Sequence, residues 1–304
     1  MSTPAIDGGL VCLYSGDGFL CAYDAQSGSQ VWTNDINREL TLSKYHGVNC
    51  SPLIMGDLVL LSAGRSGIAV DKRTGKTVWK GEDYPAGARD NFSHDSSPVP
   101  FEISGRRGVA FLILGSGIVG VDPLTGTRLW ECPYNRYEEI YLDVNFRGDE
   151  ALMAGHRWFK AGGTGQCIRA GSETNKNWSQ SYMCNLILWK DCVLGFKERE
   201  KPLSARSLYC MDWNTGRIRW EAPDVVQGGM ILVNDRLIVT TGDGFLVVAA
   251  PGDQGCTKLM RLPLRGPPKD RWYQVDLIST PAYGDNRVYY RFPGVIGCYD
   301  LKAK

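Results

Sequence analysis

The sequence lacks the features that mark several large protein classes. No apolar run approaches the roughly 18 residues that a membrane-spanning helix needs. No segment shows the 3.6-residue periodicity of an amphipathic helix. The first residues carry neither a basic region nor a long apolar core, so we expect no signal peptide in this sequence.

The sequence also has little net charge and few histidines. The formal net charge is only +1 with both signs interspersed, so nothing draws the chain toward nucleic acid or an anionic membrane. There are three histidines, and no pair of them has the spacing of metal ligands. The GxSxG, P-loop and HExxH motifs are absent. The sequence therefore offers no common catalytic signature.

The ten cysteines include no CxxC motif and no adjacent pair. Three of them hold one place in a repeat, two or three residues before a turn: Cys21, Cys210 and Cys298. Equivalent places in separate units point in equivalent directions, so we expect these thiols not to meet. We predict buried free thiols that pack as small apolar groups, a state that suits a reducing compartment.

What the sequence does contain is a repeat of Asp, three residues, Gly, three residues and Trp. Its copies are Asp24, Gly28 and Trp32; Asp71, Gly75 and Trp79; Asp122, Gly126 and Trp130; and Asp212, Gly216 and Trp220. We interpret each copy as a hairpin in which the Asp carboxylate accepts N–H groups of the turn and the Gly supplies a positive φ. The Trp is predicted to wedge between neighbouring units, because a buried indole needs a partner for its Nε1.

The spacing of the repeat gives the number of units. The Asp residues at 24, 71, 122, 212 and 300 are 47, 51, 90 and 88 residues apart, so one degenerate unit is expected in each of the last two gaps. In the first gap Trp178 is assigned to the Trp place, with Ala170 and Thr174 in place of Asp and Gly. In the second gap the apolar run 245–250 leads into an altered turn at 251–255. Four units also begin with Ser-Pro or Ser-Thr-Pro, at positions 2, 51, 97 and 279.

Seven units of this length are typical of four-stranded propeller blades. We therefore predict an all-β, seven-bladed β-propeller of antiparallel blades that forms one domain over residues 1–304. The blades are expected at about residues 2–34, 50–81, 96–133, 142–179, 183–222, 228–264 and 279–304. Blade seven has Asp300 but no outer strand in this sequence, and blade one starts at its innermost strand. We expect closure to be weak or to be completed by residues outside the sequence.

Polar residues before the innermost strands form a candidate ligand site. In a propeller such loops converge at one mouth of the central channel, where they could bind a small polar ligand or a cation. The candidates are His46, Asn49, His94, Asp95, Asp143, Trp272 and Asp276, with Gln227 arriving by the same logic. The alternative interpretation is a hydrated channel rim that binds nothing.

The stretches 51–53, 67–79 and 117–130 resemble the pyrroloquinoline-quinone-like, or quinoprotein-dehydrogenase-like, propeller repeat family over nearly the whole chain. Among its branches the chain looks most like bacterial propellers related to the scaffold lipoprotein of the outer-membrane β-barrel assembly machinery. Those relatives usually carry a signal peptide and an upstream segment that closes the ring. Quinone-dependent dehydrogenases of the family hold pyrroloquinoline quinone with Ca²⁺, a catalytic Asp and often a disulfide between adjacent cysteines, which this sequence lacks.

The resemblance implies a non-catalytic binding or scaffold propeller, in or near the bacterial envelope, with a protein partner and no cofactor. We expect a monomer that does not bind nucleic acid. The alternatives are a quinone-dependent alcohol dehydrogenase-like enzyme and a propeller that binds a carbohydrate or small ligand at its channel mouth. The repeat itself is structural and does not choose between them.

Overall fold

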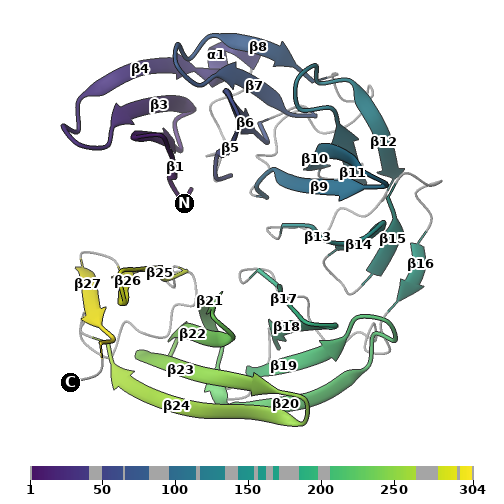
Figure 1. Ribbon diagram of the computed structural model, residues 1–304, viewed down its shortest axis with the longest axis vertical. Helices are drawn as coiled ribbons and strands as arrows, with labels where there is room; N and C mark the ends of the chain where they lie inside the picture. Colours follow the sequence, from purple (N-terminus) through teal and green to yellow (C-terminus); the bar gives the residue numbers. More distant parts are fainter. Residues whose placement is uncertain are drawn as a thin grey trace. The chain divides into compact units, whose positions relative to one another are not determined.

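The protein is an all-β, seven-bladed propeller (Figure 1), with six sheets of four antiparallel strands and one of three. The computed structural model describes residues 2–40, 50–63, 66–81, 96–113, 117–133, 143–153, 157–161, 167–170, 185–197, 206–264, 280–292 and 295–302. The chain divides into two compact units, residues 1–153 with 157–168, and residues 169–304 with 154–156.

The first unit contains blades one to three and blade four up to Ile168 in its last strand. Blade one is β1 (Ala5–Asp7), β2 (Leu10–Tyr14), β3 (Phe19–Asp24) and β4 (Gln30–Asp35). Blade two is β5 (Leu53–Met55), β6 (Leu58–Leu61), β7 (Ile68–Asp71) and β8 (Thr77–Lys80). Blade three is β9 (Val99–Ile103), β10 (Arg106–Ile113), β11 (Gly117–Val121) and β12 (Arg128–Pro133). Blade four is β13 (Asn145–Arg147), β14 (Glu150–Met153), β15 (Arg157–Lys160) and β16 (Cys167–Ala170).

The second unit contains blades five to seven. Blade five is β17 (Ile187–Trp189), β18 (Cys192–Phe196), β19 (Ser207–Asp212) and β20 (Ile218–Val226). Blade six is β21 (Gly228–Val233), β22 (Arg236–Thr241), β23 (Phe245–Gly252) and β24 (Gly255–Pro263). Blade seven is β25 (Ala282–Gly284), β26 (Arg287–Phe292) and β27 (Val295–Asp300). The predicted number of blades and the three-stranded last blade are confirmed.

Consecutive blades within each unit pack face to face through buried apolar side chains. Blades one and two share a cluster around Leu20 and Ile68, and blades two and three share one around Leu60 and Phe111. In the second unit, Leu194 of blade five packs with Val247 of blade six. This packing follows from strands that are apolar on both sides, such as β6, β11 and β18, in which every residue is buried.

One element was not predicted, a five-residue helix after β4. Helix α1 (Ile36–Leu40) begins where the Asp35 carboxylate accepts the N–H of Arg38 at 3.0 Å. Ile36 and Leu40, four residues apart, are buried in the cluster between blades one and two. A capping Asp followed by two apolar residues at this spacing was the available signal, but one turn is too short to show periodicity.

Blade four corrects the sequence prediction. We expected Ala170 in the Asp place, but Ala170 ends the fourth strand, β16. Lys160 pairs with Glu150 in the register in which Asp71 pairs with Leu58, so Lys160 holds the Asp place. The third strand β15 carries the fully buried Trp158, which takes the register place of Ala69. Trp178 and Thr174 lie outside the described residues.

The cysteine prediction is partly wrong. Cys12, Cys50, Cys132, Cys192 and Cys210 are buried free thiols, as expected. Burial raises the pKa of Cys132 to about 11, so this thiol stays protonated at neutral pH. Cys21 and Cys256 are half-buried, however, and Cys298 is exposed. Cys21 lies three residues before its Asp, whereas Cys210 lies two residues before its own. Because side chains alternate between the faces of a strand, Cys21 points to the opposite face from Cys210.

Candidate functional site

The Asp of each repeat organises its turn as predicted. The Asp71 carboxylate accepts the N–H groups of Arg73 at 3.1 Å and Thr74 at 2.8 Å, and the Thr74 hydroxyl at 2.8 Å. These hydrogen bonds, the hydroxyl of Thr74 foremost, lower the pKa of Asp71. The other copies are alike at Asp24, Asp122 and Asp212. The Gly of each copy has a positive φ: +70° at Gly28, +69° at Gly75, +71° at Gly126 and +66° at Gly216.

The Trp of one blade lies on the Gly turn of the next. The indole of Trp32 donates its Nε1–H to the carbonyl of Lys72 at 2.8 Å. A Cβ placed on Gly75 would meet Cε3 of that indole at 2.4 Å. The Gly is thus required twice, for its positive φ and for the absence of a side chain beneath the ring. The predicted wedge between blades is confirmed for this pair.

The same contact recurs between other neighbouring blades. Trp79 donates to the carbonyl of Pro123 at 2.9 Å and lies over Gly126, where a Cβ would meet the indole at 2.6 Å. In the second unit Trp220 donates to the carbonyl of Gly252 at 2.8 Å, in the altered turn of blade six. Gly28, in the turn of blade one, has nothing within 4 Å of the place its Cβ would take.

Trp130 wedges between blades three and four without a hydrogen bond. Its ring packs on Phe101 at 5.1 Å and on Phe146 at 6.1 Å between centroids. The buried Nε1 has no hydrogen-bond partner among the described residues. The turn of blade four differs in sequence from the Asp–Gly repeat, and aromatic packing replaces the usual carbonyl acceptor.

The Ser-Pro starts of the blades form a chain of hydrogen bonds along the first unit. The N–H of Thr3 donates to Oγ of Ser51 at 2.9 Å, and the N–H of Ser51 donates to Oγ of Ser97 at 3.2 Å. The N–H of Ser97 then donates to Oδ1 of Asp143 at 2.7 Å. Four consecutive blades are therefore joined at their innermost strands, and the sequence marker has a structural reason.

Asp143 and Gln227 are the only predicted channel-mouth candidates that fall within the described residues. The Asp143 carboxylate accepts the N–H of Ser97, and its role in ligand binding stays a prediction. Gln227 is buried and accepts a hydrogen bond from Nη1 of Arg206 at 3.0 Å. The remaining candidates lie outside the described residues: His46, Asn49, His94, Asp95, Trp272 and Asp276. Within the described ranges, no three His, Cys, Asp or Glu residues are grouped to hold a metal ion.

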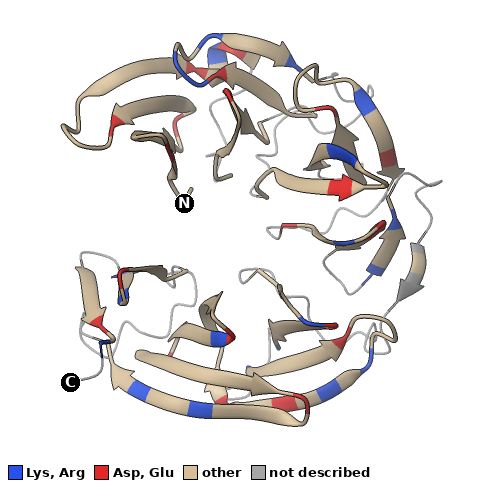
Figure 2. Ribbon diagram, in the orientation of Figure 1, with Lys and Arg blue, Asp and Glu red and all other residues tan. Residues whose placement is uncertain are grey.

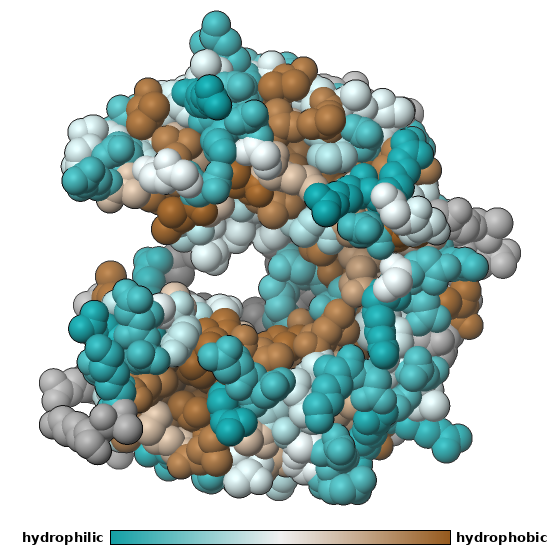
Figure 3. All heavy atoms as spheres, in the orientation of Figure 1, coloured by the Kyte–Doolittle hydropathy of each residue, from teal (hydrophilic) through white to brown (hydrophobic). Residues whose placement is uncertain are grey.

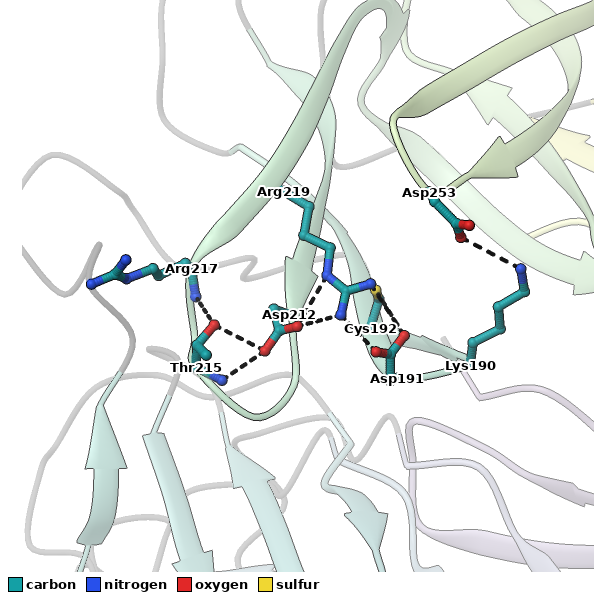
Figure 4. Close-up of polar contacts among 8 residues, drawn as sticks. All are labelled: Lys190, Asp191, Cys192, Asp212, Thr215, Arg217, Arg219 and Asp253. Atoms are coloured by element: carbon teal, nitrogen blue, oxygen red, sulfur yellow. Dashed lines mark hydrogen bonds and ion pairs between the residues drawn. The ribbon is translucent and has the colours of Figure 1, made fainter.

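Arg219 binds two carboxylates in blade five (Figure 4). Its Nη2 contacts Asp191 at 2.6 Å and also Asp212, and its Nε donates to Asp212 at 3.0 Å. Burial acts to raise the pKa of Asp212, but hydrogen bonds from Arg219 and Thr215 outweigh it and lower that pKa to about 2. The hydrogen bonds to Asp191 and Asp212 in turn raise the pKa of Arg219. Sequence reasoning missed this cluster, because the residue before the Trp, here Arg219, is Val or Leu in the other copies of the repeat.

Ion pairs of opposite polarity join the first hairpin and the neighbouring repeat turn in two blade pairs. In blades one and two, Nζ of Lys72 in the repeat turn binds Asp7 in the first hairpin at 2.6 Å. In blades five and six the charges are exchanged, since Lys190 of the first hairpin contacts Asp253 of the next turn at 3.6 Å. Charged residues of both signs also lie on the outer strands (Figure 2), where Lys258 of β24 binds Asp224 of β20 at 2.9 Å. These charged residues form ion pairs with other residues of the same chain.

Exposed apolar side chains mark the outermost strands of several blades. They are Val31 on β4, Val78 on β8, Ile168 on β16, Leu259 on β24 and Ile296 on β27. Figure 3 shows apolar residues at the surface between hydrophilic ones. Because Trp32 and Trp79 point into the fold, the residues just before them must point out of it. None of the described helices is long and apolar enough to cross a membrane.

The chain was compared with known families and structures. A family profile described as outer membrane protein assembly factor BamB matches residues 1–193. A curated protein of that name from Burkholderia pseudomallei (strain K96243) is 25% identical over 264 residues, which cover 82% of this chain and 61% of that protein. The chain therefore spans less than two thirds of the length of this relative.

Two solved structures share the fold. The crystal structure of BamB from Moraxella catarrhalis has a TM-score of 0.67 and 19% identity, and the match covers 100% of this chain and 83% of that one. The computationally designed Ika8 protein has a TM-score of 0.67 and 15% identity, covering 98% and 82% of the two chains. Since the family profile matches more than half of the sequence, including three complete copies of the Asp–Gly–Trp turn, this chain belongs to the BamB family of PQQ-like β-propellers.

Proposed function

We propose that this chain is a non-catalytic scaffold that binds protein partners in or near the bacterial cell envelope. The name of its relatives, outer membrane protein assembly factor, supports a role of this class. The observation that carries the proposal is the set of apolar side chains exposed on outermost strands, of which Val31 is 50%, Val78 49% and Leu259 52% exposed.

An outermost strand offers a partner two kinds of contact. Its outward-facing N–H and C=O groups can pair with an extended segment, and its exposed side chains can bury apolar area against that segment. In this chain the apolar side chain stands next to the buried Trp in blades one and two. The Trp anchors the strand to the next blade, so the apolar residue is presented from a rigid position.

Three of the described carboxylates are engaged in contacts within the fold. Asp143 accepts a backbone N–H, and Asp191 and Asp212 bind Arg219. A general base must be available to its substrate, whereas these groups hold blades in place. The predicted channel-mouth site is tested separately. If it binds a carbohydrate, binding should be saturable and should be lost in Trp272→Ala.

The test is the capture and mapping of a partner. The tagged chain is incubated with an envelope extract, and a retained protein is identified and then purified for direct binding. We expect Val78→Asp and Leu259→Asp to weaken that binding, and Arg73→Asp, a larger charge change at an exposed turn residue, to leave it unchanged. If the partner binds every outer-strand variant with the affinity of the native chain, the proposal is wrong.

The enzymatic alternative is tested on the same preparation. Pyrroloquinoline quinone and Ca²⁺ are added, and dye-linked alcohol oxidation is followed. The scaffold proposal predicts no turnover above a boiled control. Reproducible turnover that Asp95→Ala or Asp276→Ala abolishes would replace the proposal with an enzyme.

A further inference from the structure

We propose that a β-bulge in the outermost strands closes their edges to strand addition by other copies of this chain. This inference goes beyond the proposed scaffold function, since it concerns contacts that the blades exclude. It starts from β8, the outermost strand of blade two, which ends the strand order β5-β6-β7-β8. An outermost strand presents backbone N–H and C=O groups on which the strand of another chain can pair.

The first step is a shift of register that recurs in five blades. In blade two Ala69 pairs with Trp79, but the adjacent Val70 pairs with Thr77, so Val78 is an extra residue in β8. One extra residue of this kind defines a β-bulge. The same shift occurs in blades one, three, five and six, where the extra residues are Val31, Leu129, Arg219 and Leu259.

The second step is that packing on both faces of the blade fixes the bulge. Thr77 and Trp79 are two residues apart, so in a regular strand their side chains would point to the same face. Their partners are adjacent residues that lie in different clusters, Val70 between blades one and two and Ala69 between blades two and three. Because paired residues share a face, the extra residue turns Thr77 toward blade one and Trp79 toward blade three.

The third step is the effect of the bulge on the outer edge. The extra residue Val78 is 49% exposed. A bulge disrupts the ladder locally, bends the strand and increases its twist. Strand β8 has four residues, so at most two consecutive residues on either side of Val78 keep a regular edge. A strand added to β8 would therefore leave backbone groups without partners at the bulge, which costs free energy.

The fourth step is that the blades share the bulge and not the chemistry of its side chain. In blades one, two and six the extra residue is an exposed Val or Leu. In blade five it is Arg219, whose guanidinium binds Asp191 and Asp212. A feature that is kept while its side chain changes acts through the backbone, and closing an edge is a task of the backbone.

The test deletes the extra residue from β8. Without Val78, Thr77 and Trp79 can stay opposite Val70 and Ala69, so β8 becomes a regular edge strand whose side chains keep their present faces. Sedimentation velocity of the full chain over a range of concentrations measures self-association. We expect the deletion to strengthen self-association by about tenfold or more relative to the native chain, since a regular edge gains backbone hydrogen bonds with a second copy.

Val78→Thr is the matched control, because Thr keeps the branched shape and the extra residue. It should associate no more strongly than the native chain. Urea unfolding shows whether the deletion variant is folded. If it is not, the deletion of Leu259 makes the same test in blade six, where Lys258 and Met260 pair with the adjacent residues Ala249 and Val248.

Amide hydrogen exchange locates the contact between copies. In the associated deletion variant, amides of β8 should exchange more slowly than in the native chain, whereas amides of β4, whose bulge is intact, should be unchanged. A folded deletion variant that associates no more than the native chain would overturn the proposal. So would association of Val78→Thr equal to that of the deletion, or association without protection of the shortened strand. If neither deletion variant folds, the bulge serves packing alone and the proposal is wrong.

Discussion

Gly75→Ala tests the contact between blades, because Gly28 supplies a matched control. The two glycines hold the same place in adjacent blades and have nearly the same φ, +69° and +70°. An Ala at either position takes a left-handed conformation that costs about 1–2 kcal/mol. At Gly75 the new Cβ would also stand 2.4 Å from the Trp32 ring, whereas at Gly28 it meets nothing within 4 Å.

The difference between the two variants measures the interblade contact. Overpacking of a core position costs about 1–3 kcal/mol, so we expect losses of about 2–5 kcal/mol for Gly75→Ala and about 1–2 kcal/mol for Gly28→Ala. Urea unfolding followed by tryptophan fluorescence gives both values. Trp32→Ala should remove the extra penalty at Gly75, which a double-mutant cycle detects as coupling of about 1–3 kcal/mol. Equal losses for the two Gly variants, or no coupling, would refute the reasoning.

Three further predictions concern named contacts. Trp79→Phe should cost about 0.5–1.5 kcal/mol more unfolding free energy than Trp130→Phe, because only Trp79 loses a hydrogen bond; equal costs in urea unfolding would contradict this. The pKa of Asp212 is lowered from 3.8 to about 2, so its stabilising contribution is present above about pH 4 and is lost as pH falls through about 2. Arg219→Met should reduce that loss between pH 5 and pH 2, and an unchanged pH profile would contradict it. Asp143→Ala should destabilise the chain by about 1–3 kcal/mol, because the N–H of Ser97 loses its acceptor. Asp143→Asn keeps an acceptor oxygen and should stay close to the native stability. Equal melting temperatures of the two variants would argue against the hydrogen-bond chain.

The repeat predicted the fold because each of its three residues has a local physical task. The Asp bonds and the positive φ of the Gly belong to the turn itself and can be inferred from the sequence. The wedge also follows from the size of the indole. What the spacing did not reveal is that the ring lies on the Gly of the next blade, since that contact joins Trp32 to a residue 43 positions away.

The prediction was wrong where the repeat degenerates. In blade four Lys160 stands in the Asp place, so a search for Asp, Gly and Trp at fixed spacing placed Ala170 wrongly. Arg219 was overlooked because its partner Asp191 lies 28 residues away, across two strands. The ligand site at the channel mouth remains a prediction, since only Asp143 and Gln227 of its proposed residues lie in the described part of the chain.

Amide hydrogen exchange of the repeat turns tests the central claim, that the Trp of one blade holds the turn of the next. The Nε1–H of Trp32 donates to the carbonyl of Lys72, and that of Trp79 donates to the carbonyl of Pro123. We predict that Trp32→Ala speeds exchange of the Gly75 amide, which donates to the carbonyl of Asp71, and leaves the equivalent Gly126 amide nearly unchanged. Unchanged exchange of the Gly75 amide in Trp32→Ala would contradict the account.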